Sequence, residues 1–359
     1  MRRPRVTSAL LGAMLGVHAA CGRSSTSEAN TPRVTAPVPG SASRVAKVAD
    51  DQQSTPAASG GNALGPNAGT CTLPELPLRA TSAGRVIAVG DVHGDIDAAR
   101  DALVAAKVVD RQGRWIGGTT VVVQTGDILD RGDTEQAAID WFESLELQAA
   151  QAGGRFISLV GNHELMNAAG DFRYVTPGGF TDFEDVAGLD TKSLKFAEIP
   201  QRVRARVAAL SPGGPYAKVF GAHNVVMIVD DTVYSHAGVL GPWVTQLESA
   251  NRDARCWLDG QGAGDVPTVL TAQDGPVWTR ALAGAEVDCT AAAAVLHKLG
   301  VTRMVLGHTV QPTGISSACN DTVWRIDVGL ARNYQGPIEA LEILVGKTPS
   351  VVKGVRTSP

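Results

Sequence analysis

The sequence predicts an α/β fold in which two mixed β-sheets pack together and helices flank them. From residue 85 onward, short β-branched runs alternate with helical stretches, an order typical of a layered α/β domain. Beyond residue 220 the pattern changes, and several further strand-like runs follow. We therefore expect a central two-sheet β-sandwich with helices outside it.

The first group of strands is separated by helices. Strands are expected at 85–90, 119–125 and 156–160, because each is a short run rich in β-branched or apolar residues. Helices are expected at 96–108, where apolar residues recur at helical spacing, and at 135–150. The resulting order is β-α-β-α-β.

The second group of strands begins with a predicted hairpin, in which 225–229 and 232–235 flank a pair of aspartates. Further strands are expected at 304–306, 323–328 and 338–345. Elsewhere the pattern is weaker, and helices with loops that cover the functional site are expected at 165–220 and 240–300.

The N-terminus has the pattern of an export signal. Arginines at positions 2, 3 and 5 precede a stretch of apolar and small residues, 9–20, that is too short to span a bilayer permanently. It ends in Ala19-Ala20-Cys21-Gly22, which resembles the lipobox of bacterial lipoproteins, although His18 departs from that motif. We expect export and acylation of Cys21, which would anchor the protein in the cell envelope. Simple secretion is the alternative.

Composition divides the chain into segments. Residues 22–70 are rich in small and polar residues and bury too little apolar surface to fold, so they are expected to be a disordered tether. The expected organisation is a lipoprotein-type signal peptide at 1–21, a linker at 22–70, a folded domain at 71–346 and a C-terminal tail at 347–359.

Charge and composition limit the partners. The 359-residue chain is 44% hydrophobic and 19% charged, which suits a globular protein with a substantial core. Its formal net charge of −4 gives no general attraction for nucleic acid, so no nucleic-acid binding is expected. To bind an anion, such a protein would need local positive charge from metals or arginine.

Four cysteines follow Cys21, namely Cys71, Cys256, Cys289 and Cys319. In an oxidising compartment they allow two disulfides in any of three pairings. No CxxC spacing is present, which argues against a cysteine zinc site. The pairing stays open, with Cys256–Cys289 as the bridge we favour.

Three predicted strands end in similar loops. They lead into GDVHGD at 90–95, GDILDRG at 126–132 and GNHE at 161–164. Ligands of open α/β sheets bind beyond the carboxyl ends of the strands, and glycine lets the chain turn sharply beside a ligand. These loops should therefore bring the following polar residues together: Asp91, His93, Asp127, Asp130, Arg131, Asn162 and His163.

Two more histidines follow later strands, His236 in SHAG and His308 in LGHT. Any one histidine is better explained by local hydrogen bonds, and a single Gly-Asp pair by a turn. Three acidic or amide strand ends combined with four histidines at strand ends favour a metal site instead. The remaining three histidines lie in other settings: His18 in the signal, His297 in a helical run and His223 before a strand.

In this order, GDVHGD, GDILDRG, GNHE, SHAG and LGHT resemble the motifs of the calcineurin-like metallophosphoesterases. They are most similar to the phosphoprotein-phosphatase branch, including its bacterial Shewanella-like members. The resemblance extends from Arg85 to Gly329. The first three motifs are highly specific, whereas the last two are short, so His236 and His308 depend on order and context.

The resemblance implies roles for the matching residues. The first metal would be held by Asp91, His93 and Asp127. The second would be held by Asp127, Asn162, His236 and His308, with Asp127 bridging the two.

The resemblance also implies the residues that act on the substrate. His163 would be the general acid, and Asp130 would orient it. Arg131, and Arg280 in PVWTR, would bind phosphate oxygens. Two plainer alternatives stay open: Asp130 and Arg131 pair with each other in a turn, and Arg280 is a surface residue.

Elementary chemistry agrees with these roles. Two divalent cations roughly 3.5–4 Å apart lower the pKa of a bridging water and hold the attacking and leaving oxygens. Imidazole mixed with oxygen ligands suits Mn, Fe, Zn or Ni, but not calcium. A histidine protonates the leaving group, and a carboxylate bonded to it favours its charged form. Arginine binds phosphate at two points and supplies the local positive charge.

We therefore expect a phosphatase that depends on two divalent metal ions and hydrolyses phosphomonoesters through a metal-bridging hydroxide. Phosphoserine, phosphothreonine or phosphotyrosine in proteins and phosphorylated small molecules are the candidate substrates. One alternative is a hydrolase similar to diadenosine-tetraphosphatases. Export argues against cytosolic nucleotides as its substrates, but not against extracellular ones. The other alternative is a metal-binding protein without catalytic activity, and the complete set of motif residues argues against it. Membrane contact is expected only through the lipid anchor.

Overall fold

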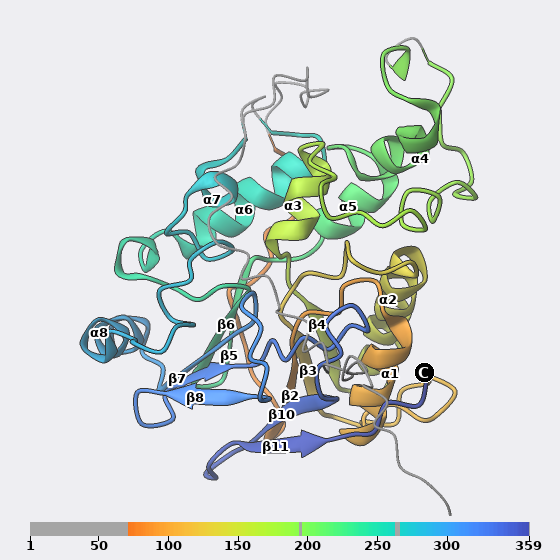
Figure 1. Cartoon of the computed structure of the whole chain (residues 1–359). Helices are drawn as coiled ribbons and strands as arrows, with labels where there is room; N and C mark the ends of the chain where they lie inside the picture. The colour runs from red at the N-terminus through yellow and green to blue at the C-terminus, as the bar shows by residue number, and fades with distance from the viewer. Residues whose placement is uncertain (1–70, 194–195, 263–265, 359) are drawn as a thin grey trace, which may run out of the picture. The chain divides into compact units, whose positions relative to one another are not determined.

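The computed structural model describes residues 71–193, 196–262 and 266–358. The predicted signal peptide and tether, 1–21 and 22–70, lie outside these residues. In the described part, two mixed sheets pack face to face with helices outside them (Figure 1), which confirms the predicted fold class.

One sheet has five strands in the order β11-β10-β2-β3-β4. Its parallel part consists of β2 (Arg85–Val89), β3 (Val121–Gln124) and β4 (Arg155–Ser158), which agree with the first three predicted strands. The antiparallel strands β10 (Glu339–Leu344) and β11 (Ser350–Lys353) complete it. The segment expected as a C-terminal tail, 347–359, thus adds a strand to the edge of the sheet.

The other sheet has six strands in the order β1-β5-β6-β7-β9-β8. The hairpin of β5 and β6 was predicted, as were β7 and β9, whereas β1 and β8 are too short to leave a sequence pattern. The strands are β1 (Arg79–Ala80), β5 (Val226–Val229), β6 (Thr232–Ser235), β7 (Arg303–Leu306), β8 (Ser316–Ala318) and β9 (Val323–Arg325).

Helices α1 (Ile96–Ala105) and α2 (Glu135–Gln151) are the predicted crossovers between the parallel strands. The segments with weak patterns also hold helices, namely α3 (Asn162–Ala168), α4 (Gln201–Leu210), α5 (Pro215–Gly221), η2 (Gly241–Trp243), α6 (Leu247–Leu258), α7 (Thr268–Thr271) and α8 (Cys289–Leu299). Of the described residues, no helix has the length and apolar character that crossing a bilayer requires.

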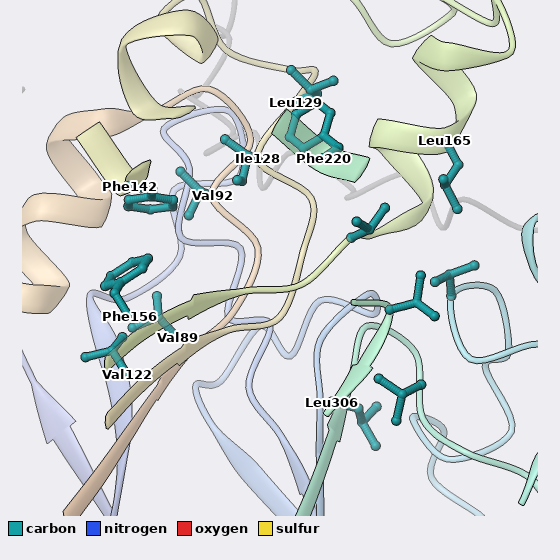
Figure 2. Close-up of a cluster of buried hydrophobic side chains, with 14 of the residues drawn as sticks. Val89, Val92, Val122, Ile128, Leu129, Phe142, Phe156, Leu165, Phe220 and Leu306 are labelled. Carbon is teal, nitrogen blue, oxygen red and sulfur yellow. The ribbon is translucent and has the colours of Figure 1, made fainter. Parts of the chain in front are cut away.

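Strands β2 and β3 are buried on both faces. Val121 and Val123 point into the space between the sheets, where they belong to a cluster that includes residues of both. Val122 points the other way, toward the helices. There Phe142 of α2 packs against Phe156 of β4 with ring centroids 4.9 Å apart (Figure 2). Continuous apolar runs such as 121–123 reflect this double burial, which is typical of parallel strands.

Two disulfides are present, Cys71–Cys256 and Cys289–Cys319. Two bridges among these four cysteines were expected, but the favoured Cys256–Cys289 pair is wrong. Cys256 lies in α6, from which it holds the first described residue, whereas Cys289 begins α8 and bonds to the turn after β8. Cys256 and Cys289 lie in different helices, and each bonds to a cysteine outside its own helix.

Candidate active site

The segments after β2, β3, β4, β6 and β7 carry the predicted site residues, and after β4 these residues, Asn162 and His163, begin helix α3. Because β2, β3 and β4 run parallel, as do β6 and β7, the carboxyl ends within each group share one edge. Contacts between these loops bring both groups to one centre, as the distances below show. Eight of the predicted residues are buried there, namely Asp91, His93, Asp127, Asp130, Asn162, His163, His236 and His308.

Asp127 lies at the middle of this centre. Its Oδ2 is 3.2 Å from His236 Nε2, 3.8 Å from His163 Nε2 and 4.0 Å from His93 Nε2. Its Oδ1 accepts a hydrogen bond of 2.9 Å from the backbone N–H of His163. Burial opposes the charged form, but His236 and His163 hold the pKa of Asp127 well below its usual value. A bridging carboxylate requires such a central position.

Three of the histidines point one ring nitrogen at a backbone carbonyl. His93 Nδ1 is 2.9 Å from Leu129 O, and His236 Nδ1 is 2.9 Å from Thr125 O. His308 Nε2 is 3.1 Å from the carbonyl of Trp278. A carbonyl only accepts, so that nitrogen carries the hydrogen, and in a neutral ring the other nitrogen exposes a lone pair. Histidines that bind metals are usually fixed in this way.

The free lone pairs face one another and the carboxylate. His236 Nε2 is 3.1 Å from His308 Nδ1 and 2.8 Å from Asn162 Oδ1, in addition to its contact with Asp127. Burial lowers the pKa of His93 to about 3 and that of His308 well below its usual value, so both are neutral. Such a convergence of lone pairs and negative charge suits divalent cations. Ligand atoms of two groups lie within 4.8 Å of one another: His93, Asp127 and His163, and Asp127, His236 and His308.

Asp91 lies beside these groups and outside both of them. Its carboxylate accepts the backbone N–H of His308, with Oδ2 at 3.1 Å, and lies 4.0 Å from His236 Nδ1. Burial raises the pKa of Asp91 well above its usual value, and Asp327 and Asp127 add to this. A cation close to Asp91 would relieve this accumulation of carboxylates.

Asp327 was missed by the sequence analysis. It is buried beside Asp91, and burial raises its pKa to about 6. Because β9 runs parallel to β7, an aspartate just after β9 reaches the same edge as His308. The strand was expected to extend to residue 328, which placed Asp327 inside it, whereas β9 ends at Arg325.

His163 has a different partner from the other histidines. Its Nδ1 is 2.5 Å from Oδ2 of Asp130, a carboxylate in place of a carbonyl. Although burial works against the charged ring, Asp127 and this hydrogen bond raise the pKa of His163 above its usual value. An imidazole with this partner keeps a proton on Nε2, as a general acid requires.

Asp130 is held by groups that the sequence did not indicate. Its Oδ1 accepts from Asn167 Nδ2 at 3.0 Å and from Arg206 Nη2 at 3.2 Å. The same Arg206, fully buried in α4, donates to Glu135 Oε1 at 2.9 Å. Arg206 lies in one of the segments with weak patterns, among other arginines, and nothing in the sequence distinguishes it from them.

The two predicted phosphate-binding arginines lie close to the histidines. Arg131 Nη2 is 3.5 Å from His163 Nε2, and its guanidinium lies 4.5 Å and 5.2 Å from the ring centroids of Tyr174 and Tyr334. Arg280 is exposed and donates to Thr309 Oγ1 at 3.0 Å, next to His308. Neither tyrosine was predicted as a site residue.

The loops themselves adopt unusual backbone conformations. His93, Asp127 and His308 have φ of 48°, 58° and 68°, a left-handed region that costs roughly 1–2 kcal/mol per non-glycine residue and that clusters at functional sites. Position 307 requires glycine for a steric reason, because a Cβ there would lie 2.3 Å from Asp91 Oδ1. Glu164 stabilises the second loop by accepting the N–H groups of Asp127, Ile128 and Leu129 at 2.8–3.0 Å.

The chain matches proteins of known type. A family model described as calcineurin-like phosphoesterase matches residues 84–312, more than half of the chain. The chain is 37% identical over 317 residues to Shewanella-like protein phosphatase 2 of Arabidopsis thaliana, covering 79% of this chain and 80% of that protein. It is 27% identical over 267 residues to Shewanella-like protein phosphatase 1 of Plasmodium berghei, covering 71% and 70%.

Solved structures agree with this match. The fold is similar to that of the cold-active protein-tyrosine phosphatase of a psychrophilic Shewanella species, with a TM-score of 0.63 and 25% identity. The similarity covers 78% of this chain and 83% of that structure.

Proposed function

The chain belongs to the calcineurin-like phosphoesterase family, and on that premise we propose that it removes phosphate from phosphotyrosine, phosphoserine or phosphothreonine in proteins. Phosphatases of this family use two divalent metal ions, and the histidine and aspartate groups described above could bind them. The proposal depends on one observation: the four histidines around Asp127 differ in the group that their ring nitrogens contact. Three are fixed by carbonyls and expose lone pairs, and one is fixed by a carboxylate and retains a proton.

The proposed metal ligands are the six residues that the motifs indicate: Asp91, His93, Asp127, Asn162, His236 and His308. Two bound divalent cations, for which we propose manganese, would activate water and neutralise the charge of the phosphate. Asp127 holds both halves of the site together, because its carboxylate reaches histidines of both groups. The carbonyl contacts of Leu129, Thr125 and Trp278 orient the rings.

The chain's own proton donor and anion-binding groups complete the proposal. His163 gives the proton on Nε2 to the leaving oxygen, and Asp130 stabilises the charged ring before that step. Arg131 lies beside His163 and binds phosphate oxygens. Arg280, whose guanidinium lies next to His308, is the second candidate for this role.

A substrate panel tests the proposal. Full-length protein supplied with Mn²⁺ should hydrolyse p-nitrophenyl phosphate and phosphopeptides, and kcat/KM for the best phosphopeptide should exceed that for diadenosine tetraphosphate by about tenfold or more, about 1.4 kcal/mol. The assay measures released phosphate at matched substrate concentrations. Faster cleavage of the dinucleotide than of every phosphopeptide would favour the nucleotide hydrolase instead.

We also propose that the protein is exported and anchored by acylated Cys21. The lipobox-like sequence supports this, and two disulfides suit an oxidising compartment. In a bacterial host, the wild-type chain should fractionate with membranes and Cys21→Ser with soluble protein. Membrane association of both forms would contradict the anchor. The absence of nucleic-acid binding stays a prediction from net charge.

A further inference from the structure

A cluster of metal-ligand side chains lies outside the active site, where α2 contacts the segment between α5 and β5. Glu143 and Glu146 lie three residues apart on α2 and therefore on one face of the helix. His223 comes from the short segment that connects α5 to β5. Glu143 is eight residues beyond Glu135, which contacts the active-site loop, and this spacing corresponds to about 12 Å along the helix.

The three side chains converge. One ligand atom from each, a ring nitrogen of His223 and an oxygen of each glutamate, lies within 4.8 Å of the other two. His223 Nε2 is 3.0 Å from Glu143 Oε1. Zinc–nitrogen and zinc–oxygen bonds are about 2.0–2.2 Å long, so small rotations of the glutamates would let all three bind one ion.

His223 is the observation that points to a ligand. Its side chain is only 6% exposed, yet neither ring nitrogen has a hydrogen-bond partner among the described residues. The 3.0 Å contact with Glu143 lacks the geometry of a hydrogen bond. A buried imidazole without a hydrogen bond is costly, and coordination of a cation by one nitrogen would remove much of this cost.

The charges favour the same interpretation. Although Glu146 is exposed, partial desolvation of its carboxyl raises its pKa, an effect that His223 opposes and Glu143 reinforces. Two carboxylates face a single imidazole in this cluster. A divalent ion balances both carboxylates and accepts the lone pair of a neutral imidazole.

We propose that Glu143, Glu146 and His223 bind a divalent transition metal such as Zn²⁺, separately from the active site. One imidazole and two carboxylates suit Zn²⁺ or Mn²⁺ and disfavour calcium. The site is independent of the proposed substrate, since none of its residues belongs to the catalytic groups.

A metal at this position would reinforce an existing contact. Tyr216 of α5 already donates to Asp140 of α2 through a 2.9 Å hydrogen bond. The backbone carbonyl of Asn224, the residue after His223, accepts the N–H of Val160 at 3.1 Å, just before Asn162 begins α3. The ion would therefore connect α2 to the segment that supports the start of α3, and its role is structural.

Metal counting tests the proposal on the full-length chain. After chelation, the wild type and Glu146→Gln are dialysed against the same low concentration of Zn²⁺, and bound zinc is measured by mass spectrometry. We expect one fewer zinc ion per chain in Glu146→Gln. Zinc should also raise the thermal unfolding temperature of the variant less than that of the wild type. Activity with Mn²⁺ should be unchanged.

Matched variants make the result decisive. Glu248→Gln, which changes an exposed glutamate in the first turn of α6, should bind as much zinc as the wild type. Glu143→Gln should lose the same single ion as Glu146→Gln, and circular dichroism verifies that both are folded. The one-ion difference should persist when Asp127→Asn is added to each chain. Equal zinc content in the wild type and both glutamate variants would overturn the proposal.

Discussion

Replacing Asp127 with asparagine should lower turnover of p-nitrophenyl phosphate by at least about 10³-fold, beyond the loss expected from one electrostatic contact. The amide can still accept the backbone N–H of His163 through its oxygen. Its NH₂ then takes the place of Oδ2, the atom that faces the lone pairs of His236 and His93. A donor there satisfies the histidines without a cation. Metal analysis should accordingly find less than two ions per chain in the active site.

The backbone does not complicate this variant. Asp127 has a φ of 58°, and asparagine accepts the left-handed region readily. Asp230→Asn is the matched control, because Asp230 has a φ of 53° in the turn between β5 and β6, at the opposite end of β6 from His236. It should retain both metals and full activity. Normal activity of Asp127→Asn would refute the bridging role.

The sequence predicted those parts of the fold that depend on local patterns. Residues 121–123 read as a buried strand because β-branched side chains fill both faces of β3, and the helical spacing after Asp95 agrees with α1. The candidate site could be predicted from the sequence for the same reason. Glycine followed by a polar residue after β2, β3 and β4 is a local signal, and the parallel order of these strands places their ends at one edge.

Contacts between distant segments left no such signal. Arg206 lies 76 positions from Asp130, and its burial depends on how α4 packs, which no local pattern records. The same limit applies to the Cys71–Cys256 disulfide, whose cysteines are 185 residues apart. Tyr334 also escaped, although its ring lies 5.7 Å from that of His93, because the residues around it carry no repeating pattern.

The position of His163 is compatible with two roles, metal ligand and proton donor. Its Nε2 lies close enough to Asp127 and His93 to count as a possible metal ligand. The hydrogen bond from Nδ1 to Asp130 favours a proton donor instead. Metal content separates these roles, because a ligand takes metal with it when removed and an acid does not.

We expect His163→Asn to lower kcat by about 10²–10⁴-fold with both metals retained. The backbone N–H of residue 163 still bonds to Asp127, so the bridging carboxylate keeps its orientation. The raised pKa of His163 keeps the wild-type acid protonated as the pH rises, and kcat should fall only once the pH exceeds it. The variant has no such proton to lose, so its kcat should lack this alkaline decline. His297→Asn, on the exposed side of α8, should behave as the wild type. If His163→Asn lost as much metal as Asp127→Asn, His163 would be a metal ligand. The proposed proton donor for the leaving group would then be wrong.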